Sequence, residues 1–324
     1  MNRNHNRLTL NSYILSGNAL PVLICSVFLG FLMLGTACKK EVEPAGPEIR
    51  LVFDPGYTTE GATVAIGKAI RFRVEASGPD ANLTNFTVKK LYGGITKTVL
   101  DSGLNSASFS TGLTFYQGVE DQVEWQLSVM DRNRNEATVS LTVYKDPNST
   151  FGGIYEFNHI KMGYQSNTAF GHYFLPLLNK VFFDDSAALN QDKTDILVYF
   201  NFREDNGVML PSPTFSSPGE ETSASGELYD LYYPALTSWT TRNYTKYDIR
   251  VENGLTEELF NQAHNDSLLI VSYDDVWGKK KYKWAIAGTL IPLQTASGKK
   301  GIILVEQADL EESGTITFSL KLQM

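Results

Sequence analysis

The segment Ala137–Tyr144 has the sequence Ala-Thr-Val-Ser-Leu-Thr-Val-Tyr, in which Val139, Leu141 and Val143 are separated by single polar residues. This period of two puts the three apolar side chains on one face of a β-strand and the polar side chains on the other. The same alternation occurs at Ile70–Ala76, and no neighbouring segment keeps a helical period. The pattern therefore predicts half-buried sheets in this part of the chain.

Turn-forming residues divide positions 48–147 into short segments of this kind. We expect seven strands: Ile49–Phe53, Ile70–Ala76, Leu83–Leu91, Thr96–Leu100, Ala107–Tyr116, Val123–Met130 and Ala137–Tyr144. Seven strands within about 100 residues are typical of an immunoglobulin-like β-sandwich, so this range is predicted to fold as one. Because the range contains no cysteine pair, its core must depend on packing, which we expect to centre on Trp125.

Asp146-Pro147-Asn148-Ser149 breaks the pattern and is the predicted boundary with a second, β-rich domain at 150–324. The expected strands of this domain are Phe151–Phe157, His172–Phe183, Ile196–Phe202, Leu268–Tyr273, Lys283–Leu293, Ile302–Gln307 and Thr315–Leu322. One or two short helices are expected, at Thr256–Ala263 with Thr256 as N-cap and as a single turn at Ser186–Asn190. Turns containing glycine join the last three strands and predict an antiparallel meander. The predicted fold class is all-β.

The first 37 residues carry two arginines, no acidic residue, and an apolar stretch at Leu20–Leu34 that ends in small residues before Cys38. This three-part pattern is typical of a secretory signal, which we predict at 1–37. Positions Leu34–Cys38 resemble the bacterial lipobox, which implies cleavage before Cys38, acylation of its thiol and a membrane as its partner. A polar tether that contains proline would follow at 38–47. The alternatives are an uncleaved anchor, or a plain secretory signal with an incidental cysteine.

The 324 residues carry a formal net charge of −8, which argues against nucleic acid as a partner. The chain has two cysteines, Cys25 within the signal and Cys38 directly after it, so we expect no disulfide in the mature protein. Its remaining histidines, His159, His172 and His264, lack the spacing of zinc ligands.

The segment Asp131-x-Asn133-x-Asn135 has the opening spacing of a calcium loop but lacks the Gly and Glu that such a loop needs. We interpret it as a hairpin turn, because Asp and Asn are also turn formers. A Ca²⁺ site there is the alternative. No metal or other cofactor is expected.

Catalytic motifs are missing from the sequence, which has no nucleophile elbow, phosphate-binding loop or dinucleotide fingerprint. No catalytic residue is therefore assigned, and we do not expect an enzyme. Acidic residues do occur as adjacent pairs: Asp184-Asp185, Glu220-Glu221, Asp274-Asp275 and Glu311-Glu312. Adjacent acids point apart, and all four pairs lie near turn residues, so we interpret them as solvated turns. A carboxylate-dependent glycoside hydrolase is the alternative.

The candidate binding residues come from an aromatic-rich stretch, Gly226–Tyr247, that follows a Ser/Pro-rich loop expected at the surface, Pro211–Glu227. They are Tyr229, Tyr232, Tyr233, Trp239, Tyr244 and Tyr247. Flat aromatic faces beside amide and cationic donors suit stacking on sugar rings or a protein interface. The alternative is that these rings cover the core of the second domain. Lysines at 279–281 and 283, which alternate with aromatic residues, are interpreted as the tip of an edge-protecting hairpin.

Several motifs resemble those of a group of Bacteroidota envelope lipoproteins that pair an immunoglobulin-like domain with a second β-rich domain. The motifs are Leu51–Phe53, Lys180–Phe182, Asp195–Phe200, Gly298–Val305 and Gly314–Thr317. The resemblance spans nearly the whole mature chain, and its motifs are structural. It implies a location at the bacterial outer membrane, on the periplasmic or the cell-surface side, and no particular activity.

These features together predict a lipid-anchored, non-catalytic protein whose first domain is a spacer and whose second domain carries a binding surface. A glycan is the expected ligand, by analogy with the spacer-plus-binding-domain layout of SusE-like lipoproteins. Another envelope protein is the alternative partner.

Overall fold

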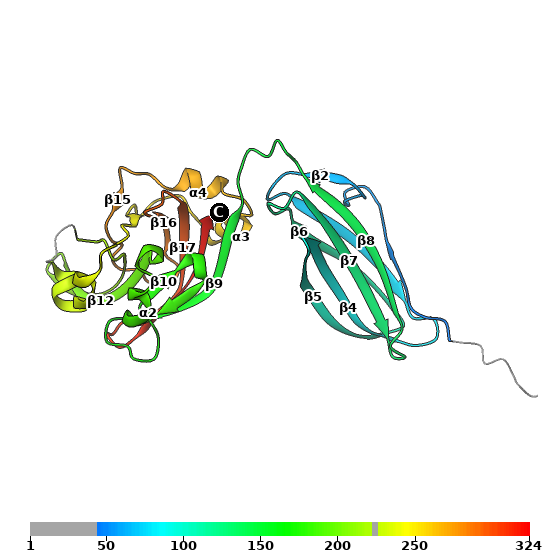
Figure 1. Ribbon diagram of the computed structural model, residues 1–324, viewed down its shortest axis with the longest axis horizontal. Helices are drawn as coiled ribbons and strands as arrows, with labels where there is room; N and C mark the ends of the chain where they lie inside the picture. The colour runs from blue at the N-terminus through cyan, green and yellow to red at the C-terminus, as the bar shows by residue number, and fades with distance from the viewer. Residues whose placement is uncertain (1–43, 222–225) are drawn as a thin grey trace, which may run out of the picture. The chain divides into compact units, whose positions relative to one another are not determined.

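The computed structural model describes residues 44–221 and 226–324, and β-strands are its main elements (Figure 1). Residues Gly46–Met324 form one compact unit. The signal at 1–37 and the lipidation site Cys38 lie outside the described residues, so both stay predictions. No helix among the described residues is long and apolar enough to cross a membrane.

The N-terminal part of this unit is a sandwich of two sheets, ordered β1-β3-β6 and β2-β8-β7-β4-β5 (Figure 1). Its strands are β1 (Glu48–Leu51), β2 (Ala62–Val64), β3 (Ala69–Ser77), β4 (Leu83–Tyr92), β5 (Ile95–Ser106), β6 (Ser108–Tyr116), β7 (Gln122–Asp131) and β8 (Glu136–Lys145). All seven expected strands are present, and the prediction of an immunoglobulin-like β-sandwich is confirmed. The additional strand β2, which pairs in parallel with β8, was missed because three residues are too few to show a period.

Trp125 of β7 joins the two sheets of the sandwich. Its side chain is 2% exposed, and its ring stacks on Phe115 with a centroid separation of 4.6 Å. It also meets Phe72 edge-on at 5.5 Å. Because Phe115 lies in β6 and Phe72 in β3, these contacts connect the five-stranded sheet with the three-stranded sheet. The core is therefore centred on Trp125, as expected.

Replacing Trp125 with alanine should destabilise the sandwich by about 3–5 kcal/mol, because a large ring is lost from a packed core. Trp125→Phe should cost less, since it keeps an aromatic ring between the sheets. Trp277, which is 46% exposed, supplies the control: Trp277→Ala should change stability by less than about 0.5 kcal/mol. Urea unfolding followed by circular dichroism measures all three, and equal effects of the two alanine variants would contradict the role given to Trp125.

The C-terminal part contains a six-stranded sheet ordered β15-β14-β16-β17-β18-β9 and a four-stranded sheet ordered β11-β10-β12-β13. The strands are β9 (Ile154–Gly163), β10 (Tyr173–Leu175), β11 (Lys180–Phe182), β12 (Ile196–Asp205), β13 (Val208–Ser216), β14 (Lys246–Asp248), β15 (Gly278–Lys279), β16 (Leu290–Gln294), β17 (Lys300–Ala308) and β18 (Thr315–Gln323). The helices are α2 (Asp184–Ala188), α3 (Glu257–Gln262) and α4 (Ser267–Ser272), with short 3₁₀ or π turns η1 (Pro176–Leu178), η2 (Gln191–Lys193), η3 (Leu228–Tyr232) and η4 (Pro234–Ser238). Among the described residues no sheet combines strands from both sides of 146–149.

Several predictions for this part are confirmed. Strands β16, β17 and β18 form the expected antiparallel meander. Helix α3 begins after Thr256, whose side chain accepts a hydrogen bond from the backbone N–H of Leu259 at 3.2 Å, so Thr256 is the N-cap. Helix α2 corresponds to the expected turn at Ser186–Asn190 and begins two residues earlier.

Three predicted strands were wrong. The expected strand His172–Phe183 is two short strands, β10 and β11, which pair with each other and are separated by the turn η1. Leu268–Tyr273 is helical, because Leu269 and Ser272 are buried at a helical spacing while Val271 is 75% exposed. A short apolar run does not by its period distinguish a strand from a helix. In the predicted strand Lys283–Leu293, the sheet begins only at Leu290.

The Ser/Pro-rich segment was also mispredicted. Val208–Ser216 is strand β13, and residues 212–218 are buried. Pro211 and Pro213 are tolerated because β13 is an edge strand: its continuous ladder is with β12, and its other edge forms a single isolated bridge, between Phe215 and Tyr282.

Strand β12 is buried on both faces. Ile196, Val198 and Phe200 pack into a cluster with residues of β9, β17 and β18. Leu197 and Tyr199 point to the opposite side, into a second cluster that contains residues of η3 and η4. The four-stranded sheet is therefore a middle layer, with the six-stranded sheet on one face and the segment around η3 and η4 on the other.

Asp195 directly precedes β12 and is partly buried. Burial raises the pKa of Asp195 to about 6, against the opposing effects of a hydrogen bond from Asn243 and the charge of Lys299. The carboxylate accepts this bond from the Asn243 side-chain amide at 3.1 Å. Because the folded-state pKa lies above the ordinary value of 3.8, the folded protein binds this proton more tightly than the unfolded chain.

The contribution of Asp195 to stability is thus fully present below about pH 3.8 and is lost as the pH rises through about 6. Asp195→Asn should remove this loss and stabilise the protein above that pH by up to about 3 kcal/mol. The Asn243 contact survives, because the asparagine oxygen still accepts a hydrogen bond. Urea unfolding of both proteins across this pH range is the measurement, and parallel stability curves would contradict the assignment.

Candidate functional site

Most of the six candidate aromatic residues are buried. Tyr229, Tyr233, Trp239 and Tyr247 are each at most 5% exposed. The hydroxyl of Tyr233 donates to the carbonyl of Val198 at 2.6 Å, and that of Tyr247 donates to the carbonyl of Ser216 at 2.6 Å. Tyr229 donates to Pro218 at 2.7 Å, and Trp239 packs 5.5 Å from Tyr173.

Three of these rings are buried because they pack on the face of β12 that the six-stranded sheet does not cover. Tyr229, Tyr233 and Trp239 belong to the same apolar cluster as Leu197 and Tyr199 of that strand. These three rings therefore cover the core of the second domain, which is the alternative interpretation of the aromatic-rich stretch. Of the six candidates, Tyr232 is partly exposed and Tyr244 is 38% exposed.

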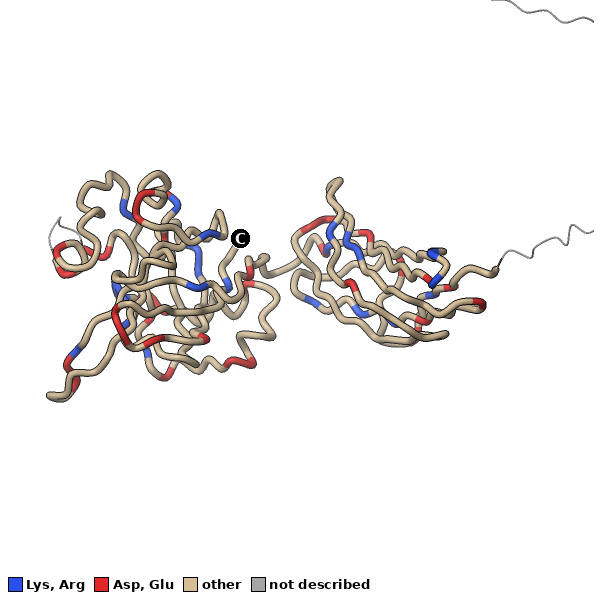
Figure 2. The backbone as a smooth tube through the Cα atoms, turned by 90° about the horizontal axis from the view of Figure 1, so that it is seen from below, with Lys and Arg blue, Asp and Glu red and all other residues tan. Residues whose placement is uncertain are grey.

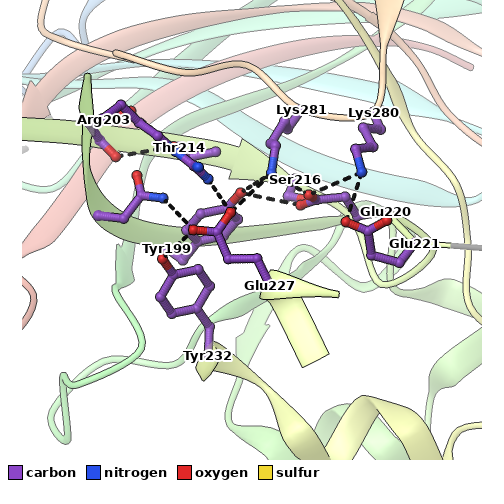
Figure 3. Close-up of polar contacts among 12 residues, drawn as sticks. Tyr199, Arg203, Thr214, Ser216, Glu220, Glu221, Glu227, Tyr232, Lys280 and Lys281 are labelled. Carbon is purple, nitrogen blue, oxygen red and sulfur yellow. Dashed lines mark hydrogen bonds and ion pairs between the residues drawn. The ribbon is translucent and has the colours of Figure 1, made fainter. Parts of the chain in front are cut away.

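A network of charged groups lies beside this cluster (Figure 3). The side chain of Glu220 is fully buried and accepts hydrogen bonds from Ser216 at 2.5 Å and from Lys281 at 2.6 Å. Lys281 also donates to the hydroxyl of Tyr199 at 3.0 Å, and neighbouring Lys280 binds Glu221 at 2.7 Å. The pair Glu220-Glu221 is therefore not a solvated turn, which corrects the sequence-based expectation.

The outer half of the network surrounds Glu227 (Figure 3). Its carboxylate binds the Arg203 guanidinium and accepts a hydrogen bond from Tyr232 at 3.0 Å. The ring of Tyr232 stacks on Tyr199 with a centroid separation of 4.7 Å. Burial alone would raise the pKa of Glu227, but the hydrogen bond and charge of Arg203 outweigh it and keep this pKa below its ordinary value.

Glu227 is thus held ionised by its partners, and Glu220 is enclosed among its donors. A glycosidase acid needs a raised pKa so that it carries a proton at neutral pH. The hydrolase interpretation therefore receives no support from Glu227. The network instead links β12, the segment after β13 and Lys281.

Lys281→Met should destabilise the protein by about 3–5 kcal/mol, because it removes the cation that hydrogen-bonds the buried Glu220 carboxylate and leaves the more distant Lys280, 3.9 Å away. Adding Glu220→Gln to this variant should recover much of the loss by removing the uncompensated charge. Lys279, which is exposed, is the matched control: Lys279→Met should cost less than about 0.5 kcal/mol. Denaturant titration compares the three variants, and equal losses for Lys281→Met and Lys279→Met would refute the structural role of Lys281.

Lys280 and Lys281 also line a groove of about 930 Å³. It is lined by Ile249, Val251, Asn253, Leu255, Lys279, Lys280, Lys281, Tyr282, Lys283, Trp284, Ile286, Ala287, Gly288, Thr289 and Leu290, which we name the lysine–tryptophan groove. Several of its apolar side chains are open to solvent, with Val251 92% and Ile286 51% exposed. Its volume is in the range of ligand-binding sites.

Trp284 has two unusual features within the groove. Its φ angle is +54°, a left-handed conformation that is uncommon outside glycine. Its indole N–H is buried and has no hydrogen-bond partner among the described residues. A buried donor without a partner costs free energy, and a ligand acceptor that reached it would recover that cost.

The electrostatics of the groove differ from those of the rest of the chain. None of its lining residues is acidic, although the protein has a net charge of −8 and Figure 2 shows acidic residues in both parts of the chain. Burial lowers the pKa of Lys283, and the charges of Arg203 and Lys281 lower it further. The groove therefore presents lysine side chains and no acidic side chain, an arrangement that suits an anionic group.

The sequence-based interpretation of this lysine segment as a hairpin tip is wrong. Only Gly278–Lys279 is a strand, whereas Lys280 and Lys281 turn inward toward Glu221 and Glu220. The signal that marked the groove was the alternation of lysine with Tyr282 and Trp284. This alternation does not reveal that the second wall of the groove comes from residues 249–255, which are distant in the sequence.

The histidines and the turn at 131–135 are accounted for by local contacts. His172 is buried and its ring bonds the carbonyl of Gly163 at 3.0 Å, and His159 bonds Glu306 at 2.8 Å. Asp131 accepts hydrogen bonds from the backbone and side chain of Asn135 at 2.9 and 3.1 Å, so the turn is confirmed. Within 44–221 and 226–324 no group of three or more His, Cys, Asp or Glu is arranged to hold a metal ion.

Comparison with known proteins gives no family. No family model matches the chain. No curated protein matches it. One similar solved structure is the crystal structure of an engineered protein, with 16% identity and a TM-score of 0.22 over 32% of this chain and 21% of that one. This similarity is too low to support a conclusion about fold or function.

Proposed function

We propose that this protein is a lipid-anchored, non-catalytic envelope protein at the bacterial outer membrane, attached through acylated Cys38. In this proposal the immunoglobulin-like sandwich is a spacer and the C-terminal part binds a ligand. The lysine–tryptophan groove is the observation that carries the proposal, because it combines aromatic and apolar walls with four lysines and no acid.

The ligand class that fits the groove best is an acidic glycan, with carboxylate or sulfate groups on its sugar rings. Tyr282 and Trp284 offer faces for sugar rings, while Lys279 and Lys283 lie beside them without a carboxylate partner among the described ion pairs. Lys280 and Lys281 are already bound to Glu221 and Glu220, so they shape the groove more than they bind the ligand.

A second candidate function, docking of another envelope protein, is favoured by the tip of the β12–β13 hairpin. Phe202, Val208 and Met209 are each more than half exposed there, with values of 54%, 57% and 58%. Exposed apolar side chains grouped on one hairpin are typical of protein interfaces.

Binding to arrays of neutral, carboxylated and sulfated glycans tests the proposal. Trp284→Ala should weaken binding of acidic glycans about tenfold or more by removing the stacking surface. Lys283→Gln should weaken the binding of acidic glycans but not of neutral ones, and it should reduce the dependence of binding on salt. Trp277→Ala, a tryptophan outside the groove, should bind as wild type.

Two outcomes would contradict the glycan assignment. The first is the absence of any glycan signal for the wild-type protein. The second is equal loss of binding in Trp277→Ala and Trp284→Ala. Co-purification of an envelope protein that depends on Met209 and Val208 would instead favour the docking function.

A further inference from the structure

Within the described part of the chain the four sheets have eight edge strands, and seven of them carry a feature that discourages pairing with another chain. Strands β2, β11 and β15 have three residues or fewer, and β1 has four, with Glu48 and Arg50 among them. Strand β13 contains Pro211 and Pro213. Strand β9 is bulged, and β5 has register shifts in its ladder with β4 and carries Lys97 and Asp101.

Strand β6 is the exception among the described edges. Its nine residues, Ser-Phe-Ser-Thr-Gly-Leu-Thr-Phe-Tyr, include no charged residue and no proline. Its ladder with β3 runs from Ser108 to Tyr116 without a register shift. No described segment pairs with its other edge, so a row of backbone donors and acceptors is left open.

We propose that β6 pairs antiparallel with β6 of a second copy of this chain, so that two three-stranded sheets join into one across a twofold axis. About its central residue, Gly112, the strand carries similar side chains at two of its four symmetric pairs of positions. In the register that places Gly112 opposite itself, Phe109 faces Phe115 of the other copy and Ser110 faces Thr114, while the remaining pairs are Thr111 with Leu113 and Ser108 with Tyr116.

The two faces of the strand agree with this register. Phe109, Leu113 and Phe115 are partly buried against the sandwich core, so aromatic residues meet aromatic residues on the inner face. Ser110 and Thr114 are exposed, so hydroxyl residues meet on the outer face. Paired aromatic residues and paired hydroxyl residues both stabilise adjacent strands, and no like charges oppose each other. A twofold contact of this kind closes on itself and gives a dimer.

Charge placement tests the register. In the chain from Gly46 onward, Ser110→Lys with Thr114→Lys puts lysine opposite lysine and should weaken the dimer at least about tenfold. Ser110→Lys with Thr114→Glu puts lysine opposite glutamate and should keep the dimer at wild-type strength or better. Sedimentation equilibrium measures the dissociation constants, and circular dichroism confirms that both variants are folded.

A cross-link gives an independent readout, because the chain from Gly46 onward contains no cysteine. A side chain added at Gly112 would lie 3.8 Å from the Tyr57 hydroxyl, an ordinary contact, so Gly112→Cys should fold normally. Residues directly opposite in antiparallel strands are about 4.5–5.5 Å apart, within disulfide range. Gly112→Cys should therefore form a disulfide dimer on oxidation, and Ser110→Cys should not.

Three results would overturn the proposal. They are a wild-type protein that stays monomeric, equal dissociation constants for the two charge variants, and equal cross-linking of Gly112→Cys and Ser110→Cys. Each would show that β6 does not pair with itself in this register.

Discussion

The C-terminal part of this protein is organised around a strand that is buried on both faces. Residues Ile196–Phe200 of β12 alternate between two apolar clusters, and neither face reaches solvent. A sheet in this position needs a layer on each side. The six-stranded sheet supplies one layer, and the segment that contains η3 and η4 supplies the other, which explains why an aromatic-rich stretch without long helices is fixed in place.

The charged network follows from this arrangement. Tyr199 of β12 ends in a hydroxyl that lies within a buried region, and Lys281 and Glu220 satisfy it. Lys281 therefore ties the segment 279–290 to the middle sheet. This attachment positions one wall of the lysine–tryptophan groove, so the proposed binding surface depends on the same buried strand as the core does.

Much of the fold was predictable from the sequence because alternation is a strong signal on half-buried strands. It identified all seven expected strands of the sandwich and the meander that ends at β18. It failed at Leu268–Tyr273, where six apolar-rich residues fit a helix and a strand equally well. It also failed at β13, since proline normally argues against a strand and only the position at a sheet edge permits it.

The site was less predictable. The composition of Gly226–Tyr247 showed many rings, but whether rings face solvent depends on which sheet face lacks a cover, and that is a tertiary property. The groove could not be predicted for the same reason, because its walls come from 249–255 and 279–290 and meet only in the folded chain. Lysine alternating with Tyr282 and Trp284 was the one local sign of it.

Hydrogen exchange measured by mass spectrometry, with and without a soluble acidic polysaccharide, tests whether the lysine–tryptophan groove binds the ligand. The ligand should slow amide exchange in 249–255 and 279–290, while exchange in 228–239, which covers β12, should be unchanged. Slowed exchange confined to 228–239, or no change in any segment, would contradict this assignment.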